Sequence, residues 1–302
     1  MKLLARLLAL AGLGALAFYL LTAPSRLDET EIAAEGSGSA ERGARLFWAG
    51  GCASCHAADD AKGEDRLKLG GGAPLETPFG TFYGPNISPH TDGLGSWTLA
   101  DFANAMQRGV GKSGRHLYPA FPYTSYVKMT PADIADLYAY LRTLPPVAGR
   151  APDNKLAFPY NVRRGLGLWK IAFGEDAAPI VALSASAGDV ERRGQYLVEG
   201  PGHCGQCHTP RSQNGLGALD HAKWLAGAPN PDGRGRIPNI TPGALEWSAG
   251  EIADYLATGF TPEYDSVGGS MVEVQTNMAE LPGEDRAAIA AYLKAIPTHQ
   301  SE

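Results

Sequence analysis

The sequence has little cysteine and no excess of positive charge. Its 302 residues include 26 Lys and Arg against 32 Asp and Glu, a formal net charge of −6, whereas a nucleic-acid-binding surface needs clustered basic residues. Only four cysteines are present, in two pairs of identical spacing, so none remains for a disulfide framework. We therefore expect neither a nucleic-acid partner nor a structural disulfide.

Glycine and proline, in contrast, are abundant, with 38 Gly and 22 Pro in the chain. Such frequent helix-breaking residues favour short helices and strands joined by long loops. The length fits two domains of ordinary size. Domains so rich in loops need something to organise their core, and a large apolar cofactor could do so.

The longest uncharged apolar run extends from Leu7 to Ala23 and follows two basic residues. It is about long enough to cross a bilayer, although a cleaved signal peptide has the same pattern. Cleavage at the end of the run would place Leu21 and Pro24 where a signal peptidase requires small residues. We therefore expect residues 1–24 to be a retained anchor, with the basic flank in the cytoplasm and the rest of the chain outside.

The remainder of the chain is a tandem repeat whose landmarks recur in the same order. Its cysteine pairs, and the tyrosines Tyr140 and Tyr292, are each separated by 152 residues. The landmarks of the first copy are Arg42-Gly43, Cys52-Ala53-Ser54-Cys55-His56, Pro85-Asn86-Ile87-Ser88-Pro89 and Trp97-Thr98; those of the second are Arg193-Gly194, Cys204-Gly205-Gln206-Cys207-His208, Pro238-Asn239-Ile240-Thr241-Pro242 and Trp247-Ser248. We therefore predict a flexible tether at 25–40, domain 1 at 41–146, a linker at 147–187 and domain 2 at 188–302.

Helix-start patterns predict that each copy is a small helical unit. A Ser or Thr followed three residues later by an acidic residue is typical of a capping box. This pattern, with the hydrophobic spacing, predicts helices over 41–48, 98–108 and 130–142 in the first copy, and helices starting at 248 and at 282 in the second. We also expect the first and last helices of each copy to cross at a glycine and a tyrosine, Gly43 with Tyr140 and Gly194 with Tyr292.

Each copy carries one Cys-x-x-Cys-His. Cysteines three residues apart lie on one helical turn, so both thiols can reach the two vinyl groups of a haem while the histidine points at the iron. A four-cysteine zinc site and a thioredoxin-like redox pair are the alternatives. We reject both because each pair has its own histidine in its own repeat, with no βαβ pattern around it. The prediction is two covalently bound haem c groups, attached at Cys52, Cys55, Cys204 and Cys207, with His56 and His208 as axial ligands.

The sixth iron ligand decides between an electron carrier and an enzyme, because a vacant position can bind peroxide or another substrate. In the second copy we expect Met271, in a loop after Gly268-Gly269-Ser270, with Met278 as a rival. In the first copy we expect Met129; His116 and a vacant site are the alternatives.

Met129 is not a simple counterpart of Met271. In the aligned copies Met129 matches Leu281, and the position that matches Met271 is near Phe121. Met129 can therefore also be explained as a buried residue at the start of a helix.

Two further segments have alternative interpretations. Pro85 and Pro238 could accept a hydrogen bond from the proximal histidines or simply form rigid turns. The basic, amphipathic stretch from Asn161 to Phe173 could lie on a membrane or a partner, or cover the seam between the domains. We expect His90, His203, His221 and His299 on the surface.

These features together carry a resemblance. The two Cys-x-x-Cys-His repeats, with Gly84-Pro85-Asn86-Ile87-Ser88-Pro89, the segment 116–126 and Gly268-Gly269-Ser270-Met271, resemble the cytochrome c subunits of membrane-bound periplasmic dehydrogenases of the alcohol, gluconate and aldehyde type. The resemblance covers nearly the whole chain after residue 40, although those subunits commonly carry three haems. It implies an all-α fold of two tandem cytochrome c-like domains with long loops, plus one N-terminal transmembrane helix.

The resemblance also implies a function. It predicts a dihaem electron carrier on the bacterial inner membrane that faces the periplasm. A periplasmic dehydrogenase or other redox protein would be the electron donor, and quinone, another cytochrome or an oxidase the acceptor. The alternative is a dihaem redox enzyme, of the peroxidase or thiosulfate-oxidising type, with a catalytic haem in domain 1.

Overall fold

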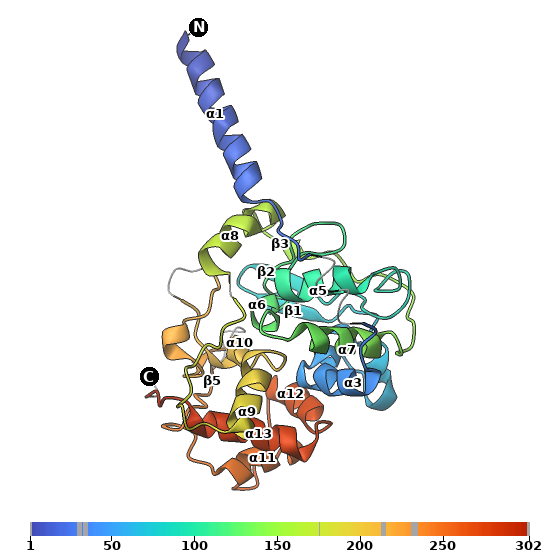
Figure 1. Ribbon diagram of the computed structural model, residues 1–302, viewed down its shortest axis with the longest axis vertical. Helices are drawn as coiled ribbons and strands as arrows, with labels where there is room; N and C mark the ends of the chain where they lie inside the picture. The colour runs from blue at the N-terminus through green and yellow to red at the C-terminus, as the bar shows by residue number, and fades with distance from the viewer. Residues whose placement is uncertain are drawn as a thin grey trace.

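The computed structural model describes residues 2–28, 32, 36–174, 176–212, 216–230 and 235–300. Its described part is mostly helical: two helical domains form the body, and one long helix projects from it (Figure 1). The predicted all-α fold class, with two cytochrome c-like domains and one N-terminal apolar helix, is confirmed.

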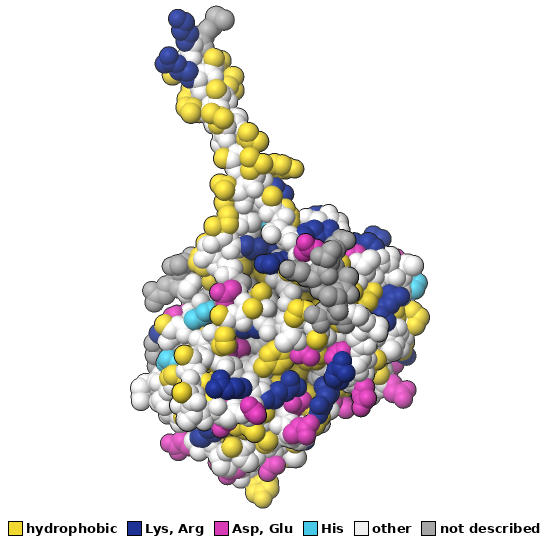
Figure 2. Space-filling view, in the orientation of Figure 1, with side chains coloured by type: hydrophobic (Ala, Val, Ile, Leu, Met, Phe, Trp, Pro, Cys, Tyr) yellow, Lys and Arg dark blue, Asp and Glu magenta, His cyan; other side chains and the backbone are white. Residues whose placement is uncertain are grey.

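The projecting helix, α1 (Lys2–Leu21), has no buried residue. Its surface is apolar along most of its length, with basic side chains near the free end (Figure 2). Among the described residues it is the one helix long and apolar enough to cross a membrane, and a signal sequence would pass the same test.

Both domains use the same order of helices. Domain 1 contains α3 (Ala40–Ala49), α4 (Cys52–His56), η1 (Gly63–Leu67), α5 (Leu99–Arg108), α6 (Tyr123–Tyr126) and α7 (Pro131–Leu141). Domain 2 contains α9 (Asp189–Glu199), α10 (Gly205–His208), η3 (His221–Lys223), α11 (Ala249–Thr258), α12 (Met271–Met278) and α13 (Gly283–Ala295).

The helix starts are where the sequence places them. Thr98 and Ser248 form complete capping boxes at the starts of α5 and α11, and Thr130 caps α7 with Pro131 as its first residue. The cap residues satisfy amide groups that the helices cannot satisfy internally.

The first and last helices of each domain cross at a glycine, as predicted. A Cβ atom on Gly43 would lie 2.0 Å from the Asp136 carbonyl oxygen and 2.8 Å from the Tyr140 Cβ. The second domain repeats the contact, because a Cβ on Gly194 would lie 1.9 Å from a carbonyl oxygen of α13 and 2.8 Å from the Tyr292 Cβ. Only glycine lets these helices approach so closely.

Short strands that the sequence did not predict hold the long loops. In domain 1, β1 (Pro74–Thr77) pairs antiparallel with β2 (Gly80–Tyr83), and β2 pairs with β3 (Lys155–Leu156) from the linker. In domain 2, β4 (Ala228–Pro229) pairs with β5 (Arg236–Ile237). Strands of two to four residues are too short to show a period of alternation in the sequence.

The segment predicted as a flexible tether makes defined contacts. Arg26 forms an ion pair with Asp101 at 3.0 Å, and the Leu27 amide donates to the Asn104 side chain at 2.8 Å. Ile32 is buried in the domain 1 core, while 29–31 and 33–35 lie outside the described residues. The contacts described follow the surface of domain 1, so they do not resemble those of a free tether.

The two domains touch directly through polar side chains. The Asn277 amide of α12 donates to the Ser54 hydroxyl at 2.8 Å, and Arg66 donates to the Asn277 carbonyl oxygen at 3.0 Å. The Tyr196 hydroxyl, in turn, donates to the Asp133 carboxylate. These contacts join residues more than 60 positions apart and fix one domain against the other.

Gly43→Ala tests the close helix crossing. Because the new methyl group would overlap backbone atoms of α7, we expect the free energy of unfolding to fall by about 1–3 kcal/mol, measured by denaturant titration of the haem-loaded protein. Gly250→Ala in α11, where the nearest atom would be 3.8 Å away, is the control and should leave stability unchanged or raise it. A G43A protein as stable as the wild type would contradict the crossing.

Candidate functional site

Each Cys-x-x-Cys-His turn follows directly after the first helix of its domain. In domain 1, α3 ends at Gly50, and Gly51 adopts a positive φ of 56° before α4 begins at Cys52. In domain 2, His203 has a φ of 39° and Cys204 caps α10. The sharp reversals fold the cysteines back beside the preceding helix.

The proximal histidines are held by proline carbonyls. His56 Nδ1 lies 2.7 Å from the Pro85 oxygen, and His208 Nδ1 lies 2.8 Å from the Pro238 oxygen. Burial lowers the pKa of both imidazoles, which are therefore neutral near pH 7, and the carbonyl bond only partly offsets this. A neutral ring that donates from Nδ1 keeps its Nε2 lone pair for iron, so the predicted hydrogen bond is confirmed and also fixes the tautomer.

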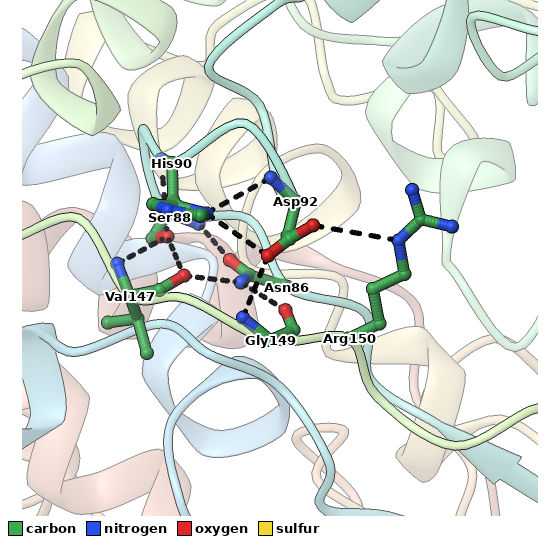
Figure 3. Close-up of polar contacts among 7 residues, drawn as sticks. All are labelled: Asn86, Ser88, His90, Asp92, Val147, Gly149 and Arg150. Atoms are coloured by element: carbon green, nitrogen blue, oxygen red, sulfur yellow. Dashed lines mark hydrogen bonds and ion pairs between the residues drawn. The ribbon is translucent and has the colours of Figure 1, made fainter.

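A polar network centred on the buried side chains of Asn86 and Ser88 follows directly after Pro85 (Figure 3). The Asn86 amide donates to the carbonyl oxygens of Val147 and Gly149 at 2.7 and 2.8 Å, and the Asn86 side-chain oxygen accepts from the Ser88 amide at 2.9 Å. Asp92 closes the ring by accepting from the Gly149 amide at 2.9 Å. The linker segment that contains Val147 and Gly149 is thus bonded to the turn that holds His56.

Domain 2 repeats this network with equivalent residues. The Asn239 amide donates to the His299 carbonyl at 2.9 Å, and its side-chain oxygen accepts from the Thr241 amide at 2.9 Å. The His299 amide donates to the Thr241 hydroxyl at 3.0 Å. No role for Asn86 and Asn239 was predicted from the sequence. Their recurrence at the same place in both copies is the feature from which this role could have been predicted.

The pKa of each of the four thiols is raised. Burial raises the pKa of Cys52 and of Cys204 to about 12, and also raises those of Cys55 and Cys207. Zinc ligation and disulfide exchange both need thiolates, so these surroundings do not favour either. Among the described residues no three or more His, Cys, Asp or Glu side chains form a group that could hold a metal ion.

One continuous cavity of about 2150 Å³ connects the two domains. From domain 1 it is lined by Cys52, Cys55 and His56, together with the apolar side chains Ile87, Trp97, Phe102, Met106, Phe121 and Leu137. Domain 2 contributes Cys207, Leu219, Lys223, Arg236 and Ile237. A large, mostly apolar space reached by thiols and by a neutral imidazole fits a haem attached through thioethers.

The two Cys-x-x-Cys-His turns lie against each other at the domain interface. The ring of His203, the residue before Cys204, has its Nε2 3.1 Å from the Gly50 carbonyl oxygen, two residues before Cys52. The ring also packs edge-on against Tyr126, with centroids 5.7 Å apart. His203 was expected on the surface, and that prediction was wrong: burial lowers its pKa, and it joins the two attachment turns.

Met129 lines the same cavity as His56. It is 2% exposed and lines the cavity beside Leu137 and Phe121. Its backbone is fixed by bonds to Gln107 and Tyr126, at 2.9 Å each. Met129 also packs in the domain 1 core, so the placement agrees with both alternatives that the sequence left open.

Met271 was predicted to lie in a loop, but it is the first residue of α12. It is half-buried and packs against the domain 2 core, while its neighbours Ser270 and Val274 line the cavity. Met278, the rival, is fully inside that core. The loop prediction was wrong because the three preceding residues, Gly268-Gly269-Ser270, obscure the helix that starts after them.

The structure aligns Phe121 with Met271. The Leu117 amide donates to the Gly109 carbonyl at 2.7 Å, and the Val267 amide donates to the Gly259 carbonyl at 2.7 Å, so the two loops have the same register. Four residues further on, Phe121 occupies the place of Met271. The first domain thus has no sulfur at this position.

His116, the other predicted rival ligand, points elsewhere. Its Nε2 lies 2.9 Å from the Thr22 carbonyl oxygen, and its own carbonyl accepts from Arg163 at 2.9 Å. It does not line the cavity. His116 instead connects domain 1 to Thr22, the residue that follows the C-terminal end of α1.

One glycine-rich segment has the spacing of a dinucleotide-binding loop. Gly109-Val110-Gly111-Lys112-Ser113-Gly114 follows helix α5, however, and Val110 forms an isolated bridge with His116. A dinucleotide loop joins a strand to the start of a helix, so this segment is a helix end and a turn.

Comparisons with known proteins agree with this geometry. The Cytochrome c family matches residues 40–145. A diheme cytochrome c-type protein of Cereibacter sphaeroides is 55% identical over 96% of this chain and 96% of its own length. A fructose dehydrogenase cytochrome subunit of Gluconobacter japonicus is 38% identical over 86% of the chain, and a gluconate 2-dehydrogenase cytochrome c subunit of Pantoea cypripedii is 35% identical over 85%. The chain spans 53% and 59% of those two subunits.

Asn86→Ala tests the network that holds the proximal histidine. Removing the buried Asn86 side chain deletes its bonds to the Val147 and Gly149 carbonyls and from the Ser88 amide, so we expect the free energy of unfolding to fall by about 1–3 kcal/mol. A less fixed Pro85 carbonyl also makes His56 a weaker electron donor, which should raise the reduction potential of one haem in a spectroelectrochemical titration. Asn239→Ala is the matched control and should move the other haem instead. Two unchanged potentials in N86A would contradict the assigned role.

Proposed function

We propose that this chain, a member of the family of dehydrogenase cytochrome c subunits and so a haem c-binding electron-transfer protein, holds two covalently attached haems. It would pass single electrons between them. The observation that carries the proposal is the contact between the two attachment turns. His203 and Gly50 join them at 3.1 Å, and one cavity reaches both.

In this proposal the chain's own residues bind and orient the cofactors. Cys52 and Cys55 form the thioethers of the first site, and Cys204 and Cys207 those of the second. His56 and His208 present Nε2 to the iron, because Pro85 and Pro238 hold Nδ1. Each haem, when bound, supplies an iron that exchanges one electron.

The distal ligands complete the proposal. We assign Met129 to the first haem because it is buried and lines the cavity, and Met271 to the second because it starts the helix beside that cavity. A thioether ligand fills the sixth position, excludes substrates from the iron and raises the reduction potential.

The partners and the compartment follow from the relatives and from the N-terminal helix. Two of the relatives are named as cytochrome subunits of fructose and gluconate dehydrogenases, which supports a dehydrogenase as the electron donor. The acceptor would be quinone, another cytochrome or an oxidase. With α1 retained in the inner membrane, both domains face the periplasm, where haem c is attached.

One observation favours a second candidate, a dihaem enzyme of the peroxidase or thiosulfate-oxidising type. Phe121 occupies the place of Met271, so the first haem would have an open distal side if Met129 does not bind. The electron carrier is the stronger candidate because Met129 lies on the same cavity as His56.

Near-infrared absorption of the oxidised protein, in the band that reports methionine–iron bonds, separates the two. We expect Met129→Ala and Met271→Ala each to remove about half of this signal, since each changes one of two ligands. Met278→Ala is the control for core damage: it deletes an equally buried methionine and should cost about 2–5 kcal/mol of stability while the signal stays whole. An unchanged signal in M129A, together with turnover of peroxide or thiosulfate by the wild type, would support the enzyme.

A further inference from the structure

The chain leaves α1 through a joint with defined contacts. Thr22, the residue after α1, is completely buried. Its hydroxyl accepts a bond from Arg164 Nε at 2.9 Å, and its carbonyl oxygen lies 2.9 Å from His116 Nε2. Arg164 also donates to the Tyr19 carbonyl and covers the Tyr19 ring at 4.4 Å. The end of the helix is therefore held by domain 1 and by the linker at once.

The helix α8 (Leu166–Phe173) lies directly against this joint, beside the foot of α1 (Figure 1). Gly167 makes the contact possible, because a Cβ there would lie 2.5 Å from the Thr22 Cα. That explains why a glycine, unfavourable within a helix, stands in this one.

The polar side of the linker faces the protein. The Lys170 ammonium donates to the carbonyls of Arg108 and Gly109 at 2.5 and 2.8 Å, and burial lowers its pKa to about 8. Trp169 donates to the Leu216 carbonyl at 2.7 Å and so reaches domain 2. The stretch thus covers the seam between the domains, one of the two alternatives that the sequence left open.

The apolar side of the same stretch faces outward. Ile171 is 65% exposed and Leu168 46%, three residues apart on α8, and Phe158, just before the stretch, is 81% exposed. Large apolar side chains this exposed along one linker mark a surface that a membrane or another molecule covers. Leu168 and Ile171 lie on α8, close to the bond between Arg164 and Thr22 at the C-terminal end of α1.

The length of α1 identifies what covers this face. Its 20 residues rise about 30 Å at 1.5 Å per residue, which equals the thickness of a hydrocarbon core. If α1 spans the bilayer, Leu21 ends at the edge of that core and Thr22 lies in the interfacial region. Since α8 packs on Thr22, its outer face lies in the same region.

We propose that Phe158, Leu168 and Ile171 form a lipid-facing seat that inserts into the bilayer interface beside α1. The seat and the Thr22 joint together hold the body in one orientation, with α11 and α13 farthest from α1 (Figure 1). Because Arg164 and Lys170 are bonded to protein groups, insertion depends on apolar contact rather than on anionic headgroups. The inference rests on the membrane anchoring in the proposed function.

Photolabelling from lipid tests the seat. The full, haem-loaded chain is reconstituted in phosphatidylcholine vesicles that contain a phosphatidylcholine with a diazirine near the top of its acyl chain, irradiated, digested and analysed by mass spectrometry. We expect adducts on α1 and on residues 157–173, and none on α11 or α13. The variant Phe158→Ser/Leu168→Ser/Ile171→Ser should lose the adducts on 157–173 and keep those on α1, with an unchanged haem absorption spectrum.

The matched control is Val190→Ser/Phe260→Ser/Val272→Ser, which removes three exposed apolar side chains of domain 2 and should leave all labelling unchanged. Label on α1 without label on 157–173 would overturn the seat and leave this face to a protein partner. Undiminished label on 157–173 in the seat variant would overturn the assignment of these three residues. Absence of label on α1 would overturn the membrane anchoring itself.

Discussion

The bond between the His203 ring and the Gly50 carbonyl is the contact on which the arrangement of this protein depends. Each partner lies one or two residues before the first cysteine of a Cys-x-x-Cys-His turn, so the two turns cannot move apart without breaking it. The Ser54–Asn277–Arg66 contacts also join the two domains. Two domains of similar structure thereby become one electron-transfer unit.

The two domains repeat one scaffold with local differences. Both domains use a glycine at the helix crossing, and an asparagine network behind a proline carbonyl that holds the proximal histidine. They differ on the distal side, where Phe121 stands in the place of Met271. In our proposal the distal ligand of the first haem is therefore Met129, which lines the cavity just before the last helix.

The repeat, the helix starts and the Cys-x-x-Cys-His turns could be predicted because each depends on local spacing. Thr98, Ser248 and Thr130 satisfy helix amides within one turn, and the Cys-x-x-Cys-His motif is itself one turn. The buried position of His203, the Thr22 contact of His116 and the helix at Met271 could not be predicted. The positions of His203 and His116 depend on tertiary packing. The helix at Met271 follows two glycines and a serine, which are typical of a loop.

The central claim, that the two haems form one unit, is tested most directly by the kinetics of electron exchange within the protein. A light pulse reduces a small fraction of the haem in the fully oxidised chain, and the redistribution between the two haem absorption bands is followed at several protein concentrations. If the turns adjoin as described, redistribution is first order, with a rate that does not depend on protein concentration. A rate proportional to concentration would show that electrons move only between molecules, and would contradict the account.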